Sequence, residues 1–332
     1  MRQWRFWLGI VITLICLVLV LWRIDYREVL AALGQANYVW LIPAALPFAG
    51  TIASKVLRWQ LLFPGDHRQI RRSKLLSALM ISYALNTLLP ARLGELARAY
   101  VIGESENLSK SLAFSTIVVE KVLDVLTLLL FLALLLPFVA LPPWVRQSAL
   151  VLAPVFLGLF ILILGVAYQR KRTLALAHAI VDRVHWLNAE RLLASLDSAL
   201  SGFDVLSSVR TNLILWGWSL AVWVTSGLFM VLVMFAFHID APAAAALMLL
   251  CVTSLGMTVP SSPGYIGVYH WLVVSTLSIF GVDRELALSF AFALHALTFV
   301  PLTLIGIYCM MRENYSLQRI EEDALRTPRA GA

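Results

Sequence analysis

Three ionisable residues interrupt an apolar stretch of the chain at intervals of three. Arg92, Glu95 and Arg98 follow Pro90 in a segment that is otherwise hydrophobic enough to enter a membrane. Charged side chains are costly at that depth and indicate a functional role by default. Glu95 neutralises only one arginine, so the other guanidinium is available to hold a phosphate through paired hydrogen bonds. An anion-binding site is one interpretation, and a purely structural ion pair is the other.

Two carboxylates lie further along the chain. Glu120 and Asp124 are four residues apart, which places them on one face of a helix, with Lys121 next to Glu120. The two negative charges need another cation, and Arg92 or Arg98 is the expected supplier. The group is either a structural network or part of a binding site for a substrate or a coupling ion.

A second polar group lies in the other half of the chain. Ser261, Ser262, Tyr265 and His270 surround another interruption, and His295 follows on the next apolar segment. Hydroxyl groups beside a broken helix offer donors to an anion, and a helix that begins near Tyr265 would direct its positive dipole end there. Histidines in membrane helices are more often hydrogen-bonded packing groups, and that interpretation stays open for both. No cluster has metal-ligand spacing, and no metal or cofactor is expected.

Proline and glycine mark both interruptions at the same spacing, with a proline four residues before a glycine. Proline removes a backbone donor and glycine adopts unusual dihedral angles, so a helix is expected to break there. Irregular backbone at membrane depth is tolerated only where it is buried in protein or lines a wet cavity. Paired breaks in two halves of a chain indicate the binding site of a transporter. The breaks are formed by Pro90 and Gly94, and by Pro260, Pro263, Gly264 and Gly267.

The composition indicates an all-α polytopic membrane protein. Hydrophobic residues make up 61% of the chain and charged residues 14%, against about 25% charged in soluble proteins. About six full spans and two broken-helix hairpins are expected. The spans are predicted at 7–22, 38–57, 115–138, 149–168, 212–237 and 286–311, and the hairpins at 75–103 and 243–280. The cysteines, Cys16, Cys251 and Cys309, lie in apolar segments and are expected to be packing residues.

Lysine and arginine predict the orientation of the chain. Basic residues, Lys55 and Arg58 among them, gather in the loop after the second span, in segment 169–210 and after the last span. The positive-inside rule places these regions and both termini in the cytoplasm. Two units of span, hairpin and span, at about 38–138 and 212–311, then have opposite senses, as in an inverted-topology repeat.

One transmembrane domain is expected over 1–312. Its segment 169–210 is amphipathic, which favours a helix on the cytoplasmic interface, although an ordinary soluble linker helix fits the pattern equally. Residues 313–332 form a polar cytoplasmic tail.

No GxSxG, P-loop or HExxH motif is present, so an enzyme is not expected. No nucleic-acid module is recognisable either, and the net charge of +7 fits anionic lipid headgroups.

The motif at the first break resembles the transmembrane region of the lysylphosphatidylglycerol synthase family. The family pattern Asn-x-x-x-Pro-x-Arg-x-Gly-Glu-x-x-Arg is similar to the stretch from Asn86 to Arg98. Ser115 with the carboxylates of the next span, and the Pro-x-x-Pro-Gly-x-x-Gly of the second break, are similar too. The resemblance covers about residues 38–311. The chain departs from the family at His270, where an acidic residue is common. The resemblance does not include the aminoacyl-transferase domain, so synthesis of a lysyl lipid is not expected.

The resemblance implies movement of lipids, because relatives are linked to flipping aminoacylated phospholipids or polyprenyl-linked sugars. We expect a flippase in the bacterial inner membrane for an anionic phospholipid or a polyprenyl-phosphate-linked glycolipid, with envelope-biosynthesis proteins as candidate partners. The alternatives are a membrane-embedded glycosyl or acyl transferase and a non-transporting scaffold of an envelope-biosynthesis complex. The residues expected to contact the substrate are Asn86, Arg92, Glu95, Arg98, Glu120, Asp124, Ser261, Ser262, Tyr265 and His270.

Overall fold

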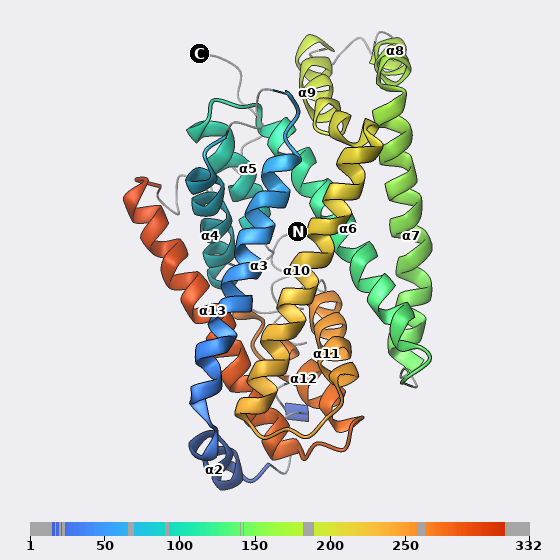
Figure 1. Ribbon diagram of the computed structural model, residues 1–332. Coiled ribbons are helices and arrows are strands. Elements are labelled where there is room, and N and C mark those ends of the chain that lie inside the picture. The colour runs from blue at the N-terminus through green and yellow to red at the C-terminus, as the bar shows by residue number, and fades with distance from the viewer. Residues whose placement is uncertain are drawn as a thin grey trace.

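A computed structural model describes residues 15–16, 18–19, 21, 24–65, 70–89, 93–139, 141, 143–181, 189–257 and 263–315. Every regular element in these ranges is a helix (Figure 1), which confirms the all-α class. The α-helices are α2 Tyr26–Gln35, α3 Leu41–Leu61, α4 Arg72–Leu88, α5 Gly94–Ser105, α6 Lys110–Leu135, α7 Pro143–Tyr168, α8 Arg170–Val181, α9 Ala189–Ser201, α10 Val209–Ala236, α11 Ala243–Gly256, α12 Val268–Ser278 and α13 Arg284–Arg312. Short 3-10 turns are η1 Tyr38–Trp40, η4 Asp204–Ser207 and η5 Pro263–Tyr265.

Four helices in the described part of the chain are long and apolar enough to cross a membrane. They are Tyr38–Leu61, Pro143–Tyr168, Val209–Ala236 and Arg284–Arg312, and they match four of the predicted spans. The predicted span 115–138 lies in α6, which has 26 residues but carries three charges in its first half. The predicted span 7–22 lies largely outside the described residues.

The predicted end of the second span is wrong by four residues. Helix α3 continues to Leu61, so Lys55 and Arg58 stand on the helix and not in the following loop. The Arg58 side chain is fully buried. Arg58 can stay charged within α3 because two carboxylates of α6, Asp124 and Glu120, lie beside its guanidinium.

The two broken segments form helical hairpins. Helices α4 and α5 have 17 and 12 residues, and α11 and α12 have 14 and 11, all fewer than the roughly 20 that a span requires. The α4–α5 hairpin lies in the upper half of the molecule and the α11–α12 hairpin in the lower half (Figure 1). Each hairpin therefore enters from its own end and turns back.

The first helices of the two units, α3 and α10, run in opposite directions and pack along each other (Figure 1). The first helix of each hairpin packs crosswise, α4 against α13 and α11 against α6, whereas α5 and α12 pack against α6 and α13 of their own units. Each hairpin thus contacts the last helix of the other unit. These directions agree with the two units of opposite sense that the sequence predicts.

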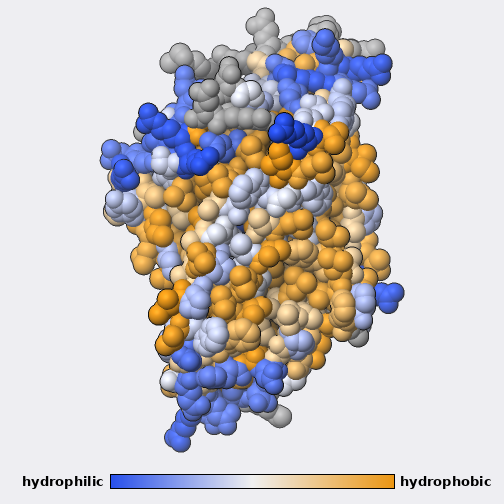
Figure 2. All heavy atoms as spheres, viewed as in Figure 1, coloured by the Kyte–Doolittle hydropathy of each residue, from blue (hydrophilic) through white to orange (hydrophobic). Residues whose placement is uncertain are grey.

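On the face seen in Figure 2, an apolar band lies between two polar ends of the molecule. Helix α7 contributes strongly to it, because Leu150, Val155 and Leu162 are among its many exposed apolar side chains. The amphipathic segment 169–210 contains two helices, α8 and α9, at one end of the molecule (Figure 1). Arg170 of α8 pairs with Asp197 of α9 over 2.7 Å and with Asp204 of η4 over 2.5 Å. The tail beyond residue 315 lies outside the described residues.

Candidate functional site

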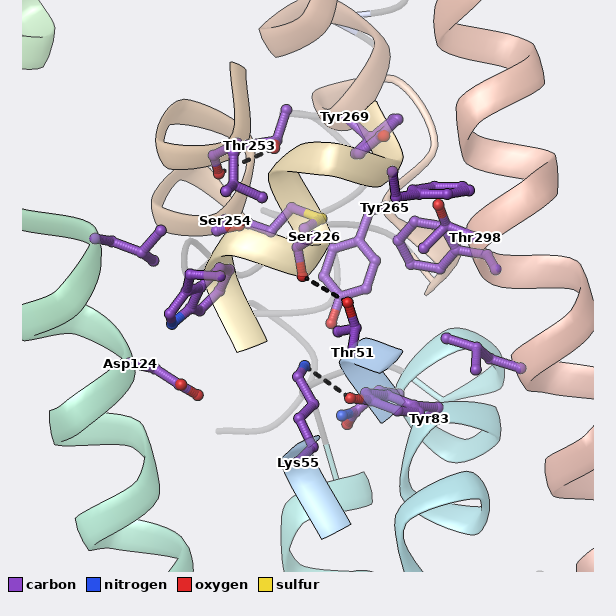
Figure 3. A pocket seen from close by; sticks show the side chains of 18 of the residues that line it. Thr51, Lys55, Tyr83, Asp124, Ser226, Thr253, Ser254, Tyr265, Tyr269 and Thr298 are labelled. Carbon is purple, nitrogen blue, oxygen red and sulfur yellow. Dashed lines mark hydrogen bonds between the residues drawn. The ribbon is translucent and has the colours of Figure 1, made fainter. Parts of the chain in front are cut away.

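A cavity of about 300 Å³ lies where the two hairpins approach each other. Its wall combines residues from both hairpins and from the long helices α3, α6, α10 and α13 (Figure 3). Thr87, at the end of α4, and Gly264 of η5 show how close the hairpins come: a Cβ built on Gly264 would lie 3.8 Å from the Thr87 methyl group. The cavity thus connects the two helix breaks.

The first buried ion pair behind the cavity joins α3 to α6. Arg58 Nη1 donates to Asp124 Oδ1 over 2.7 Å and to the Ser219 hydroxyl of α10 over 3.0 Å. Arg58 is not accessible to solvent, whereas the Asp124 side chain is 13% exposed and lines the cavity. Arg58 therefore supports Asp124 from behind and does not face the cavity itself.

The second buried ion pair joins α5 to α6. Arg98 donates to both carboxylate oxygens of Glu120, over 2.8 and 2.9 Å. Its guanidinium carbon lies 3.6 Å from the ring centroid of Trp59, close enough for a cation–π interaction. Arg98 and Glu120 are both buried and neither lines the cavity. From the sequence we expect Arg92 or Arg98 to compensate the carboxylates, and Arg98 compensates Glu120 in this pair.

A third ion pair lies on the cavity wall. Lys121 Nζ is 2.8 Å from Glu95 Oε1, and both side chains line the cavity. The Lys121 side chain is 48% exposed. Glu95 thus pairs with Lys121, whereas the sequence suggested an arginine partner. Each of the three carboxylates in this region has its own cation.

Among the described cations around the cavity, Lys55 is the one that pairs with no carboxylate. Its ammonium donates to the Tyr83 hydroxyl over 2.8 Å and lies 5.4 Å and 5.9 Å from the ring centroids of Tyr83 and Trp223. Figure 3 shows the Lys55 side chain extending between Asp124 and Tyr83. A positive charge therefore faces the cavity with a neutral partner only.

Hydroxyl groups line the cavity beyond Lys55. Thr51 Oγ1 lies 2.8 Å from Thr225 Oγ1 and 3.3 Å from Ser226 Oγ, which links the middle of α3 to α10. Further hydroxyls come from the second hairpin and α13, and apolar rings complete the wall. They are Thr253, Ser254, Tyr265, Tyr269 and Thr298, with Phe48, Phe229 and Phe299. The cavity is therefore amphipathic, with one charged region and one hydroxyl-rich region.

The first break is closed by a side-chain cap. The Gly94 backbone N–H donates to Asn86 Oδ1 over 2.9 Å, at the residue where α5 begins. A Cβ on Gly94 would lie 2.1 Å from the Ser82 carbonyl oxygen and 2.6 Å from Asn86 Oδ1, so only glycine fits. Asn86 also lines the cavity. Pro90 and Arg92 lie outside the described residues.

The described part of the second break, residues 263–267, contains three residues with positive φ: Gly264 at 69°, Tyr265 at 58° and Gly267 at 87°. His295 Nε2 donates to the Gly264 carbonyl oxygen over 2.7 Å, and the Gly267 N–H donates to His270 Nδ1 over 3.4 Å. The two imidazoles thus hold the backbone of the break from α12 and α13.

The predicted site residues divide into three groups. Asn86, Glu95, Asp124 and Tyr265 line the cavity. Arg98, Glu120 and His270 are buried near it without lining it. Arg92, Ser261 and Ser262, with Pro260, lie outside the described residues. No group of three or more metal-ligating side chains occurs in the ranges that the structure describes.

The sequence reasoning missed Lys55, Arg58, Tyr83 and Thr51. The first two were counted as loop charges because they follow a long apolar run. A signal was available: no proline or glycine stands between Lys55 and Leu61, and the stretch Val-Leu-Arg-Trp-Gln-Leu continues apolar residues at helical spacing. A buried arginine on such a helix requires a carboxylate partner.

Comparison with known proteins identifies the family. The family model of the lysylphosphatidylglycerol synthase transmembrane region matches residues 6–306, so the chain belongs to this family. A UPF0104 membrane protein of Methanothermobacter thermautotrophicus is 25% identical over 316 residues, 90% of this chain and 92% of that protein. Glycosyltransferase AglD of Haloferax volcanii is 24% identical over 95% of this chain, which spans 55% of AglD. No solved structure matches the chain significantly.

Proposed function

We propose that this member of the lysylphosphatidylglycerol synthase transmembrane-region family is a lipid transporter of the inner (plasma) membrane. The headgroup enters the cavity between the two hairpins, while the acyl or prenyl tails stay in the bilayer. The observation that carries the proposal is the placement of the cavity: broken helices from opposite ends of the molecule meet at one amphipathic cavity. Such breaks surround the substrate in transporters built from inverted repeats.

The chemistry of the wall supports this proposal. A polar headgroup loses its water when it enters the hydrocarbon region, and each unsatisfied polar group then costs several kcal/mol. The cavity offers replacement partners, namely the Lys55 ammonium, the hydroxyls of Thr51 and Ser226, and the Asn86 amide. The apolar rings on the same wall suit the region where the headgroup joins the tails. A lipid headgroup therefore has a lower barrier to crossing here than in the bilayer.

A transferase is the second candidate function, because one relative, AglD, is named a glycosyltransferase. That activity needs a general base within reach of the acceptor, and a carboxylate is the usual choice. Glu95, Glu120 and Asp124 each pair with a cation, so the described cluster offers no unpaired carboxylate for this role. AglD also extends well beyond the region matched by this chain. These points favour transport over transfer.

The proposal can be tested in proteoliposomes with a fluorescent phosphatidylglycerol and a membrane-impermeant quencher. Wild-type protein should raise the rate of lipid exchange between leaflets above that of protein-free vesicles. Ser226→Phe should lower this rate about tenfold, because a ring at the cavity wall takes the space of a headgroup. Leu157→Phe, on the exposed face of α7, is the matched control and should retain the wild-type rate. Equal rates with and without wild-type protein would contradict transport, and turnover of a glycosyl or acyl donor by the purified protein would favour the transferase.

A further inference from the structure

The charged side chains around the cavity do not balance. In the described part of the chain the cluster contains four cations, Lys55, Arg58, Arg98 and Lys121, and three carboxylates, Glu95, Glu120 and Asp124. Lys121 pairs with Glu95 and Arg98 with Glu120, while Arg58 pairs with Asp124 over 2.7 Å and lies 3.9 Å from Glu120. The cluster therefore carries one net positive charge, and Lys55 is the residue that carries it.

The surplus charge is available to a ligand. An ammonium group has three N–H donors, and the hydrogen bond to Tyr83 uses one of them. Lys55 lines the cavity, so its remaining donors have access to a bound molecule. An ionised group at membrane depth without a counter-charge is costly, and an anion in the cavity would remove that cost.

The two arginines are not equivalent to Lys55. Arg98 uses both ends of its guanidinium on Glu120 and stacks on Trp59, and Arg58 is fully buried behind Asp124. A phosphate could reach either arginine only by displacing a buried carboxylate, which would leave an uncompensated charge. Lys55 can bind a phosphate without displacing a carboxylate, so the geometry favours Lys55 as the residue that binds the phosphate.

The rest of the wall is suited to a neutral, hydroxylated group. Thr51, Ser226 and Thr298 lie on the side of the cavity away from Asp124 (Figure 3). Hydroxyls donate and accept, and they carry no charge, so they match the hydroxyls of a glycerol or a sugar. A ligand with an amino group would find no free carboxylate there, since every described carboxylate of the cluster is already paired.

We propose that the site selects lipids by charge: it binds a phosphodiester monoanion at Lys55 with a neutral hydroxylated headgroup against Thr51, Ser226 and Thr298, and it rejects aminoacylated headgroups of net positive charge. This inference rests on the proposed function, because the same cavity is the site. Both phosphatidylglycerol and a polyprenyl-monophosphoryl hexose have the required chemistry. An aminoacylated phospholipid brings a like charge towards Lys55, and such a contact is unfavourable.

The binding test uses purified full-length protein in detergent, with thermal unfolding as readout. Phosphatidylglycerol and a polyprenyl-monophosphoryl hexose are titrated separately, with phosphatidylcholine and lysylphosphatidylglycerol as comparisons. At least one of the two monoanionic lipids should bind about tenfold more tightly than lysylphosphatidylglycerol, and the tighter of the two identifies the source of the phosphodiester. Equal or tighter binding of lysylphosphatidylglycerol would overturn the inference.

Variants at Lys55 provide the second arm. Lys55→Met should weaken monoanion binding about tenfold and abolish the preference over lysylphosphatidylglycerol, while Lys55→Arg should retain most of the preference, because the charge is kept. Lys171→Met, an exposed lysine of α8, is the matched control and should behave as wild type. An unchanged preference in folded Lys55→Met would overturn the assignment of Lys55. Because binding is measured without transport, selective binding with no flipping would refute the proposed function alone, and flipping without charge preference would refute this inference alone.

Discussion

Arg58 Nη1 donates to Asp124 Oδ1 over 2.7 Å although the two residues stand 66 positions apart in the chain. The same nitrogen reaches Ser219, so one guanidinium ties α3, α6 and α10 together. Helices α3 and α10 begin the two units, and α6 ends the first. The pair thus holds the elements that form one side of the cavity, and its integrity sets the position of Asp124.

Arg58→Met should therefore destabilise the protein strongly. Removing one partner of a buried ion pair leaves an uncompensated charge and costs about 3 kcal/mol. Thermal unfolding in detergent measures the effect, with Arg146→Met as an exposed control that should change little. Adding Asp124→Leu to Arg58→Met should restore part of the stability, because the orphaned charge is gone. A melting temperature of Arg58→Met equal to wild type would show that the pair contributes nothing.

Glu120 and Asp124 should respond differently to neutral substitution. Glu120 is buried and gives both oxygens to Arg98, so Glu120→Gln should lower stability, with loss of transport in proportion to loss of folded protein. Asp124 lines the cavity, so Asp124→Asn should reduce transport per folded molecule beyond any loss of stability. Flipping rates normalised to folded protein separate the two. Identical normalised rates for both variants would contradict this division.

Gly94→Ala should disrupt the first break. The added methyl would lie 2.1 Å from the Ser82 carbonyl oxygen and 2.6 Å from Asn86 Oδ1. A backbone carbonyl cannot rotate out of the way as a side chain can, so α5 must shift away from α4. We expect a loss of about 3 kcal/mol or more, comparable with other overpacked sites. Gly158→Ala on α7, where nothing lies within 4 Å, is the control and should be neutral or slightly stabilising. Equal melting temperatures for the two variants would contradict the close approach.

Local sequence features predicted the elements of the site better than its pairings. The proline and glycine of the first break fixed the start of α5 at Gly94, because their backbone constraints act locally. The spacing of Glu120 and Asp124 placed them on one face for the same reason. Arg98 was a correct candidate for Glu120. The partner of Asp124 was not predicted, because Arg58 lies on a different helix. Helical periodicity predicts only contacts within one helix. Lys55 was missed because a charge at the end of an apolar run was assigned to a loop.

The end of the molecule that contains α8 and α9 should face the cytoplasm. Basic residues occur in the segments at this end, including Arg71 before α4 and Lys171 and Arg172 in α8, as the positive-inside rule requires. In a background without the native cysteines, Arg172→Cys should react with a membrane-impermeant maleimide only after permeabilisation. Asp240→Cys, in the turn between α10 and α11, should react in intact cells. Labelling of residue 172 in intact cells would reverse the orientation.

His295 should be a positioning residue of the second break. Its Nε2–H donates over 2.7 Å to the carbonyl of Gly264, whose φ of 69° is a conformation that few other residues adopt. His295→Leu removes the donor and leaves a part-buried carbonyl unsatisfied, at a cost of about 1–3 kcal/mol. Because Tyr265 lines the cavity next to Gly264, transport per folded molecule should fall as well. His295→Gln, which retains an N–H donor, should recover part of both losses. If glutamine and leucine reduce transport and stability equally, the hydrogen bond to Gly264 does not position the break, and His295 acts through packing alone.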